Sequence, residues 1–387
     1  MSTRQELESK LSSCKIDVPA FVISEELLEE NLKKIKSVAD LAGIEVIPAL
    51  KASALWQTFP QIKKYFNALA ASSLWESKLC FDQFGAKAHT YAPAFNNRSF
   101  NEICNYSDHI IFNSIAQFDR FYNTAKGKGI NNIGLRVNPA YSDVKTDKYN
   151  PCIEGSRLGV HPDDMPATLP SGVNGLHFHA LCESDSYSFE RVFNSFEKHY
   201  SKYLNQIEWL NIGGGHLITH KDYDTEHFIS LIKKFKEKYS LKIYLESGAA
   251  LVWQAGWLIS HIEDIIESKG IKIALLDVSF AAHMPDCLEM PYQPEIIGAC
   301  TEPSEAEYTY RMGGSSCLAG DWIGNWGFPA PLNVGDKVIF KDMIHYTIVK
   351  TSYFNGVEHP SILRLTKNNS IQEMREFSYS DYKNRVN

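Results

Sequence analysis

The stretch Gly-Ile-Glu-Val-Ile-Pro-Ala-Leu-Lys-Ala-Ser-Ala, Gly43–Ala54, is a short apolar run that ends abruptly on a lysine. Such a run is typical of a buried parallel strand, here expected over Val46–Leu50. Residues just after these strands face the ligand side of an α/β fold, so Lys51 lies where chemistry usually occurs. A lysine in an apolar collar has a depressed pKa and can hold a carbonyl compound as a Schiff base. The alternative is a lysine that only extends its charged end into solvent.

Strand-like and helix-like segments alternate outward from this stretch. Helical patterns such as Ser114–Thr124, Phe189–Leu204 and Asp224–Tyr239 separate most of the strands. Eight strands alternating with helices over about 200 residues predict an α/β fold of the (β/α)8 TIM-barrel type. A doubly wound open sheet is the alternative, but no Gly-x-Gly-x-x-Gly follows an early strand. The expected strands are Val46–Leu50, Asn67–Ala70, Ala88–Tyr91, His109–Phe112, Ile133–Val137, Gly175–His179, Trp209–Ile212 and Lys242–Leu245.

The pattern changes after about Ser247, where short strands separated by turn residues replace the helices. This texture predicts a C-terminal all-β domain. The lone strand Ala20–Ile23 can belong to it, and Ser24 is a plausible N-cap for a helix that runs to about Asp40. The expected strands of this domain are Gly256–Glu267, Ile273–Val278, Tyr308–Gly313, Lys337–Phe340, Tyr346–Lys350 and Ile362–Arg364.

The predicted domains are therefore a barrel over residues 24–247 and a β-domain made of residues 1–23 and 248–387. Residues 1–19 are expected to hold a short amphipathic helix and a linker. The polar tail from Lys367 is expected to be mobile.

Composition excludes several classes of function. A net charge of −7 over 387 residues argues against nucleic-acid or anionic-membrane binding. No apolar run approaches membrane-spanning length, and the polar N-terminus is unlike a signal peptide. The eight cysteines are scattered, with no Cys-x-x-Cys pair. That distribution argues against the usual zinc spacings and indicates reduced thiols in a cytoplasm.

Polar residues stand at the ends of several predicted strands, where barrel sites gather. Arg136 ends one strand, and His177 and His179 share a face of the next by alternation. The following strand runs into Gly213–Gly215, whose backbone N–H groups can close on an anion. Glu246 ends the last strand.

This set of groups suits one cofactor. Pyridoxal phosphate needs an amine for its aldehyde, a cradle for its phosphate and an acid for its pyridinium nitrogen. Each residue also has a plain structural alternative: His179 as a core histidine, Glu246 as a helix cap and Arg136 as an ion-pair partner. The combination favours the cofactor.

The chain resembles the fold-type III, alanine racemase-like pyridoxal phosphate decarboxylases over about residues 20–365. Within that family, Phe280–Tyr292 and Cys182-Glu183 are similar to members that act on carboxypolyamines, namely carboxynorspermidine and carboxyspermidine. The other motifs that carry the resemblance are Pro-Ala-Leu-Lys-Ala, His-Phe-His, Ile-Gly-Gly-Gly and the later Gly-Gly-Ser-Ser-Cys-Leu-Ala-Gly-Asp.

The resemblance implies a role for each barrel residue. Lys51 would form the Schiff base with pyridoxal 5'-phosphate, and His179 would stack on its ring. Gly213, Gly214 and Gly215 would cradle the phosphate with help from Tyr346. Glu246 would pair with the pyridinium nitrogen, and Arg136 would lie near the cofactor.

The resemblance also implies a homodimer with shared active sites. In relatives the cysteine-containing loop comes from the partner subunit, so Cys317 would be the proton donor to the carbanion carbon. The implied reaction is decarboxylation in the biosynthesis of norspermidine and spermidine.

Three positions depart from the family pattern. Ser247 and Ala249 stand where relatives commonly carry proline and a charged residue, which leaves part of the phosphate or substrate contact open. Leu318 follows the loop cysteine where diaminopimelate enzymes carry glutamate, which argues against that substrate. Candidate anions for a polyamine tail are Glu183, Asp286, Glu289 and Asp321, and Asp286 is preferred, with a loop-capping role as its alternative.

Other functions stay open at this point. The nearest are decarboxylases of ornithine, arginine or diaminopimelate. A non-catalytic homologue that binds partners is a further alternative, and retention of Lys51 and Cys317 argues against it. A racemase would need a second base, for which the sequence offers no clear tyrosine.

Overall fold

The computed structural model describes residues 3–387, which form two compact units. The barrel unit is Asn31–Leu251, and the sheet unit consists of the residues up to Glu30 together with Val252–Asn387. The expected division at residues 24 and 247 lies a few residues from these boundaries. Helix α2 (Glu25–Ala42) crosses the first of them.

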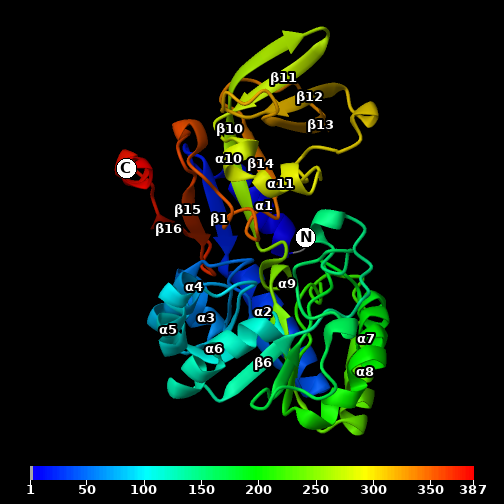
Figure 1. Ribbon diagram of the computed structural model, residues 1–387. Helices are drawn as coiled ribbons and strands as arrows, with labels where there is room; N and C mark the ends of the chain where they lie inside the picture. The colour runs from blue at the N-terminus through cyan, green and yellow to red at the C-terminus, as the bar shows by residue number, and fades with distance from the viewer. Residues whose placement is uncertain (1–2) are drawn as a thin grey trace. The chain divides into compact units, whose positions relative to one another are not determined.

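The barrel unit is a nearly closed barrel of parallel strands, as predicted (Figure 1). Its strands follow the order β2-β9-β8-β7-β6-β5-β4-β3, and every adjacent pair is parallel. A parallel bridge between Ala49 and Ala70 joins the two ends of this order. The strands are β2 (Glu45–Pro48), β3 (Ala70–Ala71), β4 (Ala88–Tyr91), β5 (Ser107–Phe112), β6 (Asn132–Arg136), β7 (Gly175–His177), β8 (Trp209–Asn211) and β9 (Lys242–Ser247).

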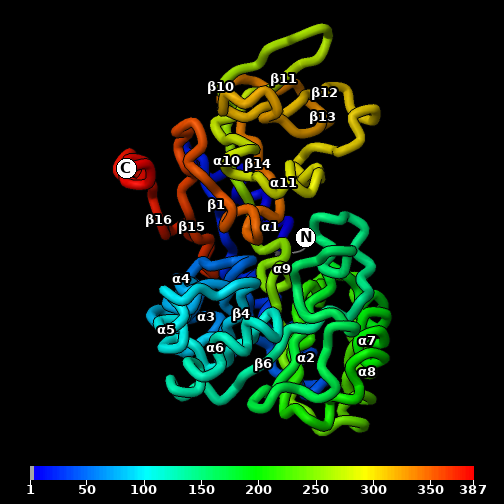
Figure 2. Tube along the Cα trace, in the orientation of Figure 1, coloured from blue at the N-terminus to red at the C-terminus, as the bar shows by residue number. Residues whose placement is uncertain are grey.

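Side-chain caps mark the starts of several barrel helices, including the one predicted at Ser24. The side chains of Ser24, Ser114 and Asp224 accept hydrogen bonds from first-turn backbone N–H groups, which would otherwise have no partner. Helices α7 and α8 lie side by side (Figure 2). Besides α2, the helices are α3 (Phe59–Ile62), α4 (Leu74–Leu79), α5 (Asn97–Tyr106), α6 (Ile115–Gly127), α7 (Ser186–Tyr200), α8 (Thr225–Lys238) and α9 (Ala249–Val252).

A tryptophan fills the barrel interior near the amino ends of the strands. Trp209 is 3% exposed and packs with Tyr244 in an apolar cluster. Neighbouring strands make room for it with glycine: a Cβ on Gly134 or Gly175 would lie 2.4 or 2.0 Å from Trp209 ring atoms. The indole can therefore occupy this layer only because both positions lack a side chain.

The sheet unit is built on mainly antiparallel strands around a strand from the start of the chain. β1 (Ala20–Ser24) pairs antiparallel with β10 and parallel with β15, as Figure 1 shows by colour, so the lone N-terminal strand belongs to this sheet as expected. The order is β13-β12-β11-β10-β1-β15-β16, and β14 also pairs with β10. The other strands are β10 (Gly256–Ser268), β11 (Ile271–Leu276), β12 (Tyr308–Gly313), β13 (Trp322–Phe328), β14 (Lys337–Lys341), β15 (Ser361–Leu365) and β16 (Ile371–Arg375).

The helix expected within residues 1–19 is α1 (Thr3–Ser13), and residues 1–2 lie outside the described part. Leu7 and Leu11 of α1 join the core of the sheet unit together with Val22 and Trp257. The other helices of this unit are α10 (Phe280–His283), α11 (Pro285–Glu289) and α12 (Tyr379–Val386).

Two sequence predictions for the sheet unit are wrong. Residues 346–350 form a turn instead of a strand, because Tyr346 has φ 42°, which a strand cannot adopt, and Lys350 N–H donates to its carbonyl. The tail from Lys367 is ordered into β16 and α12. Ser378 and Asp381 form a capping box at the start of that helix, a Ser-x-x-Asp signal that the sequence carried.

We predict that Gly175→Ala lowers the free energy of unfolding by about 1–3 kcal/mol, because its methyl group would overlap the Trp209 ring. Urea denaturation followed by tryptophan fluorescence measures the change. Gly127→Ala is the matched control, since its Cβ would meet nothing within 4 Å. Equal stability of the two variants would contradict the close packing.

Candidate active site

The predicted barrel residues all lie at the carboxyl ends of parallel strands, which share one end of the barrel. Lys51 follows β2, Arg136 is the last residue of β6, and His179 follows β7. Gly213 follows β8, and Glu246 is the last residue but one of β9. The topology therefore brings the five positions to one end of one barrel.

Asn211 connects two parts of this site. Its Nδ2 donates to Glu246 Oε1 at 3.0 Å, and its Oδ1 accepts from Gly213 N–H at 2.8 Å. Glu246 N–H in turn donates to Gly213 O at 2.7 Å. Asn211 is 1% exposed, so water does not compete for either hydrogen bond. One amide thus fixes the carboxylate and the first glycine together.

The electrostatics keep Glu246 charged inside the protein. Burial alone would raise its pKa, but His177, Lys51 and the Asn211 hydrogen bond together hold the pKa below its usual value. Burial lowers the pKa of Lys51, and Glu246 offsets part of that effect. Burial also lowers the pKa of His177 to about 3, against the attraction of Glu246, whose Oε1 lies 3.6 Å from its Nε2.

His179 is fixed by the glycine loop and by Arg136. Its Nδ1 accepts from Gly214 N–H at 2.8 Å, and its carbonyl accepts from Arg136 Nη2 at 3.1 Å. Burial lowers the pKa of His179 well below its usual value, so the ring is neutral. The Arg136 guanidinium also lies 4.7 Å from the centre of the Tyr91 ring. Arg136 therefore orients the strand end that carries His179.

The glycine loop offers an anion fewer N–H donors than its three residues suggest. A Cβ on Gly213, Gly214 or Gly215 would lie 2.2–2.5 Å from a neighbouring carbonyl oxygen, so only glycine allows this close approach. The N–H groups of Gly213 and Gly214 already donate within the protein, so of the three we expect the Gly215 N–H to meet an anion. Ser247 Oγ is buried and has no hydrogen-bond partner among residues 3–387. These donors, beside the amine of Lys51 and the carboxylate of Glu246, fit pyridoxal phosphate.

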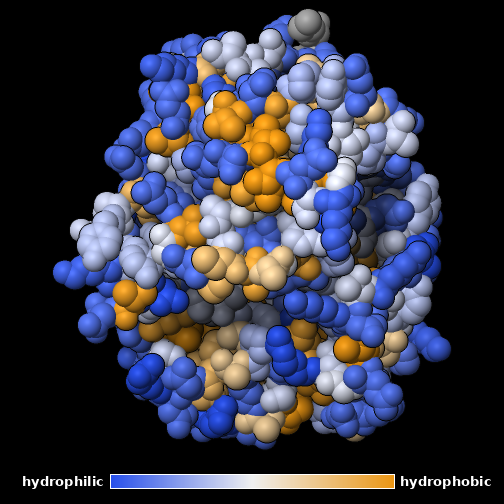
Figure 3. Space-filling view, turned by 90° about the horizontal axis from the view of Figure 1, so that it is seen from above, coloured by the Kyte–Doolittle hydropathy of each residue, from blue (hydrophilic) through white to orange (hydrophobic). Residues whose placement is uncertain are grey.

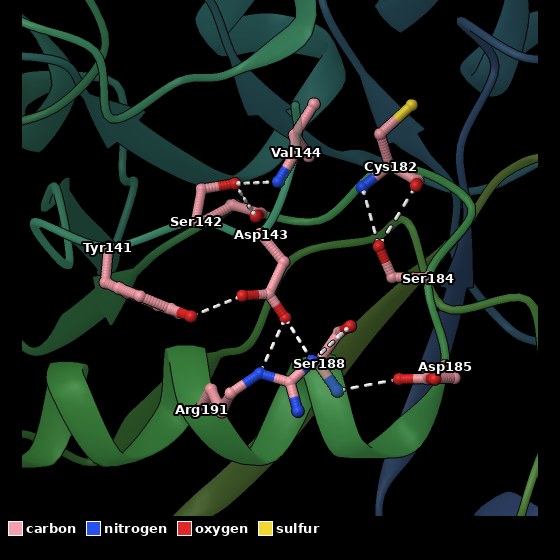
Figure 4. Close-up of polar contacts among 10 residues, drawn as sticks. Tyr141, Ser142, Asp143, Val144, Cys182, Ser184, Asp185, Ser188 and Arg191 are labelled. Atoms are coloured by element: carbon pink, nitrogen blue, oxygen red, sulfur yellow. Dashed lines mark hydrogen bonds and ion pairs between the residues drawn. The ribbon is translucent and has the colours of Figure 1, made fainter. Parts of the chain in front are cut away.

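Two loops beside the site are fastened to helix α7 (Figure 4). Arg191 of α7 donates from Nε to Asp143 Oδ2 at 2.8 Å, and Tyr141 donates to the same carboxylate. Burial raises the pKa of Asp143, but hydrogen bonds from Arg191 and Tyr141 outweigh it and leave the pKa lowered. Ser142 Oγ donates to Ala180 O at 2.7 Å, which ties this loop to the one after β7.

Glu183 lies in this second loop, beside Cys182. It is exposed and has φ 45°, an uncommon value for a residue with a side chain. Ser184 Oγ donates to Cys182 O at 3.0 Å and holds the turn. Substrate binding by Glu183 stays a prediction.

The Cys317 loop of the sheet unit is held by a buried carboxylate. Asp321, 4% exposed, accepts from Ser316 N–H at 3.0 Å and from Ala281 N–H at 2.9 Å. Cys317 is exposed, and its N–H donates to Asn355 Oδ1 at 2.8 Å. A substrate ammonium would have to compete with these donors for Asp321, whose substrate role stays a prediction.

Asp286 has a different environment. It is 7% exposed, and its Oδ2 accepts from Tyr292 OH at 3.1 Å and from Thr347 Oγ1 at 2.9 Å. Its Oδ1 has no hydrogen-bond partner among the described residues. One oxygen of a fixed, buried carboxylate is therefore available for a cation. Tyr346, next to Thr347, is half-buried, and its role at the phosphate stays a prediction.

Sequence reasoning missed Asn211 and Tyr91. Asn211 stands directly before Ile-Gly-Gly-Gly at the end of β8, a position that could have been inspected. Tyr91 ends β4 and contacts both Arg136 and the edge of His177. No motif signals it, because its partners come from other strands.

The fold and the site define a pyridoxal phosphate enzyme of the alanine racemase-like type. A family described as "Pyridoxal-dependent decarboxylase, C-terminal sheet domain" matches residues 20–344. A carboxyaminopropylagmatine decarboxylase of Synechocystis is 47% identical over 95% of both chains. A carboxynorspermidine/carboxyspermidine decarboxylase of Campylobacter jejuni is 40% identical over 95% of this chain and 98% of its own.

The crystal structure of carboxynorspermidine decarboxylase from Campylobacter jejuni, complexed with norspermidine, matches with a TM-score of 0.87 and 39% identity over 96% of this chain and 100% of that one. The chain belongs to the pyridoxal-dependent decarboxylases. It is a carboxy-lyase that uses pyridoxal phosphate. Within residues 3–387, no helix combines the length and apolarity that a membrane span requires.

We predict that Asn211→Ala raises the pKa of Glu246, because the variant loses a hydrogen bond that stabilises the charged carboxylate. Activity should then be lost at a higher pH on the acid side of its profile, and kcat should fall roughly 10-fold. The pH dependence of the cofactor absorbance should move in the same direction. The kcat of Glu246→Gln should fall by about 10²–10³, and this is the largest loss that Asn211→Ala can cause through Glu246.

The exposed Asn131→Ala is the control for Asn211→Ala. An unchanged pH profile and absorbance in Asn211→Ala would remove Asn211 from this role.

Proposed function

We propose that the enzyme decarboxylates carboxynorspermidine and carboxyspermidine to norspermidine and spermidine. The observation that carries the proposal is Asp286, a buried carboxylate with one oxygen held by two hydroxyl groups and the other without a partner among the described residues. Such an oxygen suits a single ammonium group by a charge-assisted hydrogen bond. The Campylobacter jejuni relative and a Herminiimonas arsenicoxydans relative at 33% identity, both named for these substrates, support it.

Leu318 supports the exclusion of diaminopimelate. The distal end of that substrate carries a carboxylate as well as an ammonium group. Leu318 is apolar and can pair with neither, so both charges would be desolvated without compensation. A polyamine tail brings only ammonium groups.

The second candidate substrate is carboxyaminopropylagmatine, favoured by the Synechocystis relative at 47% identity. The two candidates differ at the end of the tail, which is an ammonium in one case and a guanidinium in the other. A guanidinium pairs best with both oxygens of a carboxylate. Because Tyr292 and Thr347 occupy one oxygen of Asp286, the ammonium is the better fit.

The protein groups divide the chemistry between them. Pyridoxal phosphate, when bound, accepts the electron pair that the departing carboxylate leaves behind. Lys51 supplies the amine for the cofactor aldehyde, and the burial that lowers its pKa favours the neutral, nucleophilic form. Glu246 holds the proton at the ring nitrogen. Cys317 donates a proton to the substrate α-carbon.

We predict that purified enzyme releases carbon dioxide faster from carboxynorspermidine than from diaminopimelate, ornithine or arginine. Asp286→Asn should raise KM for carboxynorspermidine about 10- to 100-fold, because a hydrogen bond to a charged group contributes about 1.5–3 kcal/mol. Glu295→Gln, an exposed carboxylate paired with Lys341, is the control.

The same assay separates the candidates. A higher kcat/KM for carboxyaminopropylagmatine would select the second substrate, and faster turnover of diaminopimelate or ornithine would refute the carboxypolyamine assignment. An Asp286→Asn variant with the KM of the parent enzyme would remove Asp286 from the site.

The active site is also proposed to be shared within a homodimer. Cys317 is exposed on the surface of its unit, and Leu318 and Trp322 beside it are 46% and 44% exposed. Apolar side chains gather among polar ones on the face seen in Figure 3. A second copy could cover such residues and receive the cysteine.

We predict that Lys51→Ala and Cys317→Ser, each nearly inactive alone, regain activity when mixed. If each site takes its lysine and its cysteine from different subunits, half of the mixed protein is heterodimer with one intact site, so about a quarter of the parent activity returns. Light scattering gives the oligomeric state in parallel. A mixture that stays inactive although subunits exchange would place both residues in the same subunit.

A further inference from the structure

A second group of chemically active side chains lies at the opposite end of the barrel. His89 is the second residue of β4 and His109 the third of β5, and the two are register partners on adjacent strands. The register shifts between Ala88 and His89, so Asp108 is an extra residue on β5. A bulge of this kind changes the direction of a side chain. It brings the Asp108 carboxylate beside the His109 ring, with Oδ2 2.9 Å from Nδ1.

Both imidazoles are buried, and that of His109 is incompletely bonded. His89 is 6% and His109 is 4% exposed. His109 Nδ1 lies against the Asp108 carboxylate, and its Nε2 has no hydrogen-bond partner among the described residues. Buried polar atoms in native proteins are nearly always paired, so the unpaired Nε2 of His109 suggests a ligand. Burial holds the pKa of His89 well below its usual value, which leaves its ring neutral.

A cavity of about 300 Å³ opens beside these residues. Its lining includes the two histidines and Asp108, and three further charged residues, Glu45, Glu208 and Lys242. The lining carries three carboxylates and one lysine, a negative balance that favours a cation. Glu45 pairs with Lys242 at 3.0 Å, which leaves Asp108 beside the histidines.

We propose that His89, Asp108 and His109 bind a divalent transition-metal ion of the zinc type. Each residue offers one ligand atom, and these atoms lie within 4.8 Å of one another. Two imidazoles and a carboxylate are ligands that such ions prefer, and water can complete the shell. The sequence spacing does not reveal the set, since its ligands come from two strands.

Binding requires one movement. The His89 and His109 rings are stacked, with centroids 3.6 Å apart and planes 18° from parallel. One ion cannot lie in the planes of two stacked rings, so one imidazole turns out of the stack into the cavity when the ion binds. The bound ion would tie β4 to β5 at the amino ends of the strands, away from Lys51 and Glu246. It is therefore a stabilising site and takes no part in catalysis.

The test uses untagged holoenzyme dialysed against a chelator and titrated with Co²⁺. Isothermal titration gives the stoichiometry and Kd, and visible absorption distinguishes nitrogen and oxygen ligands from thiolates such as Cys317. We expect one equivalent of Co²⁺ per chain, no thiolate bands and an unchanged decarboxylation rate. His109→Gln and Asp108→Asn should each weaken binding about 10- to 100-fold.

Asp108 is exposed, so Asp108→Asn keeps the test valid if His109→Gln does not fold. The exposed pair His161–Asp163, 3.4 Å apart, supplies the control His161→Gln, which should bind Co²⁺ as the parent enzyme does. Binding that is absent, that shows thiolate bands or that survives unchanged in Asp108→Asn would overturn the proposal.

Discussion

A buried carboxylate that must stay charged organises the barrel unit. Glu246 is 8% exposed, and burial acts against its ionised form. Asn211, Lys51 and His177 compensate, and each comes from a different strand end. The closed parallel barrel is what brings these strand ends together, because carboxyl ends of parallel strands meet at one face. The position of each partner therefore depends on the register of the whole barrel.

The glycine residues show two different uses of a missing side chain. At the carboxyl end, Gly213–Gly215 let backbone carbonyl groups approach to distances that a Cβ would forbid. At the amino end, Gly134 and Gly175 give space to a single indole. The first use shapes a ligand site and the second fills a core, and no local sequence pattern separates them.

The sequence was sufficient for what depends on local pattern. The alternation of strand and helix patterns predicted the barrel, and strand ends located Lys51 and Glu246. It was insufficient where partners come from separate strands. Asn211 is recognisable only through its contacts with Glu246 and Gly213, and the His89–Asp108–His109 group depends on a bulge. The strand predicted at residues 346–350 is wrong for another reason. The backbone turns at Tyr346 and buries Thr347 against Asp286, a contact between distant parts of the sequence.

The position of β1 in the sheet has a consequence for synthesis of the protein on the ribosome. Ala20 leaves the ribosome long before its register partners, Ile259 of β10 and Ser361 of β15. The intervening barrel segment is complete in sequence before either partner has left the exit tunnel. Until those partners emerge, the nascent chain must therefore carry an unpaired, largely apolar strand, a segment prone to aggregation. A chain that stops before Ser361 leaves one edge of that strand permanently open.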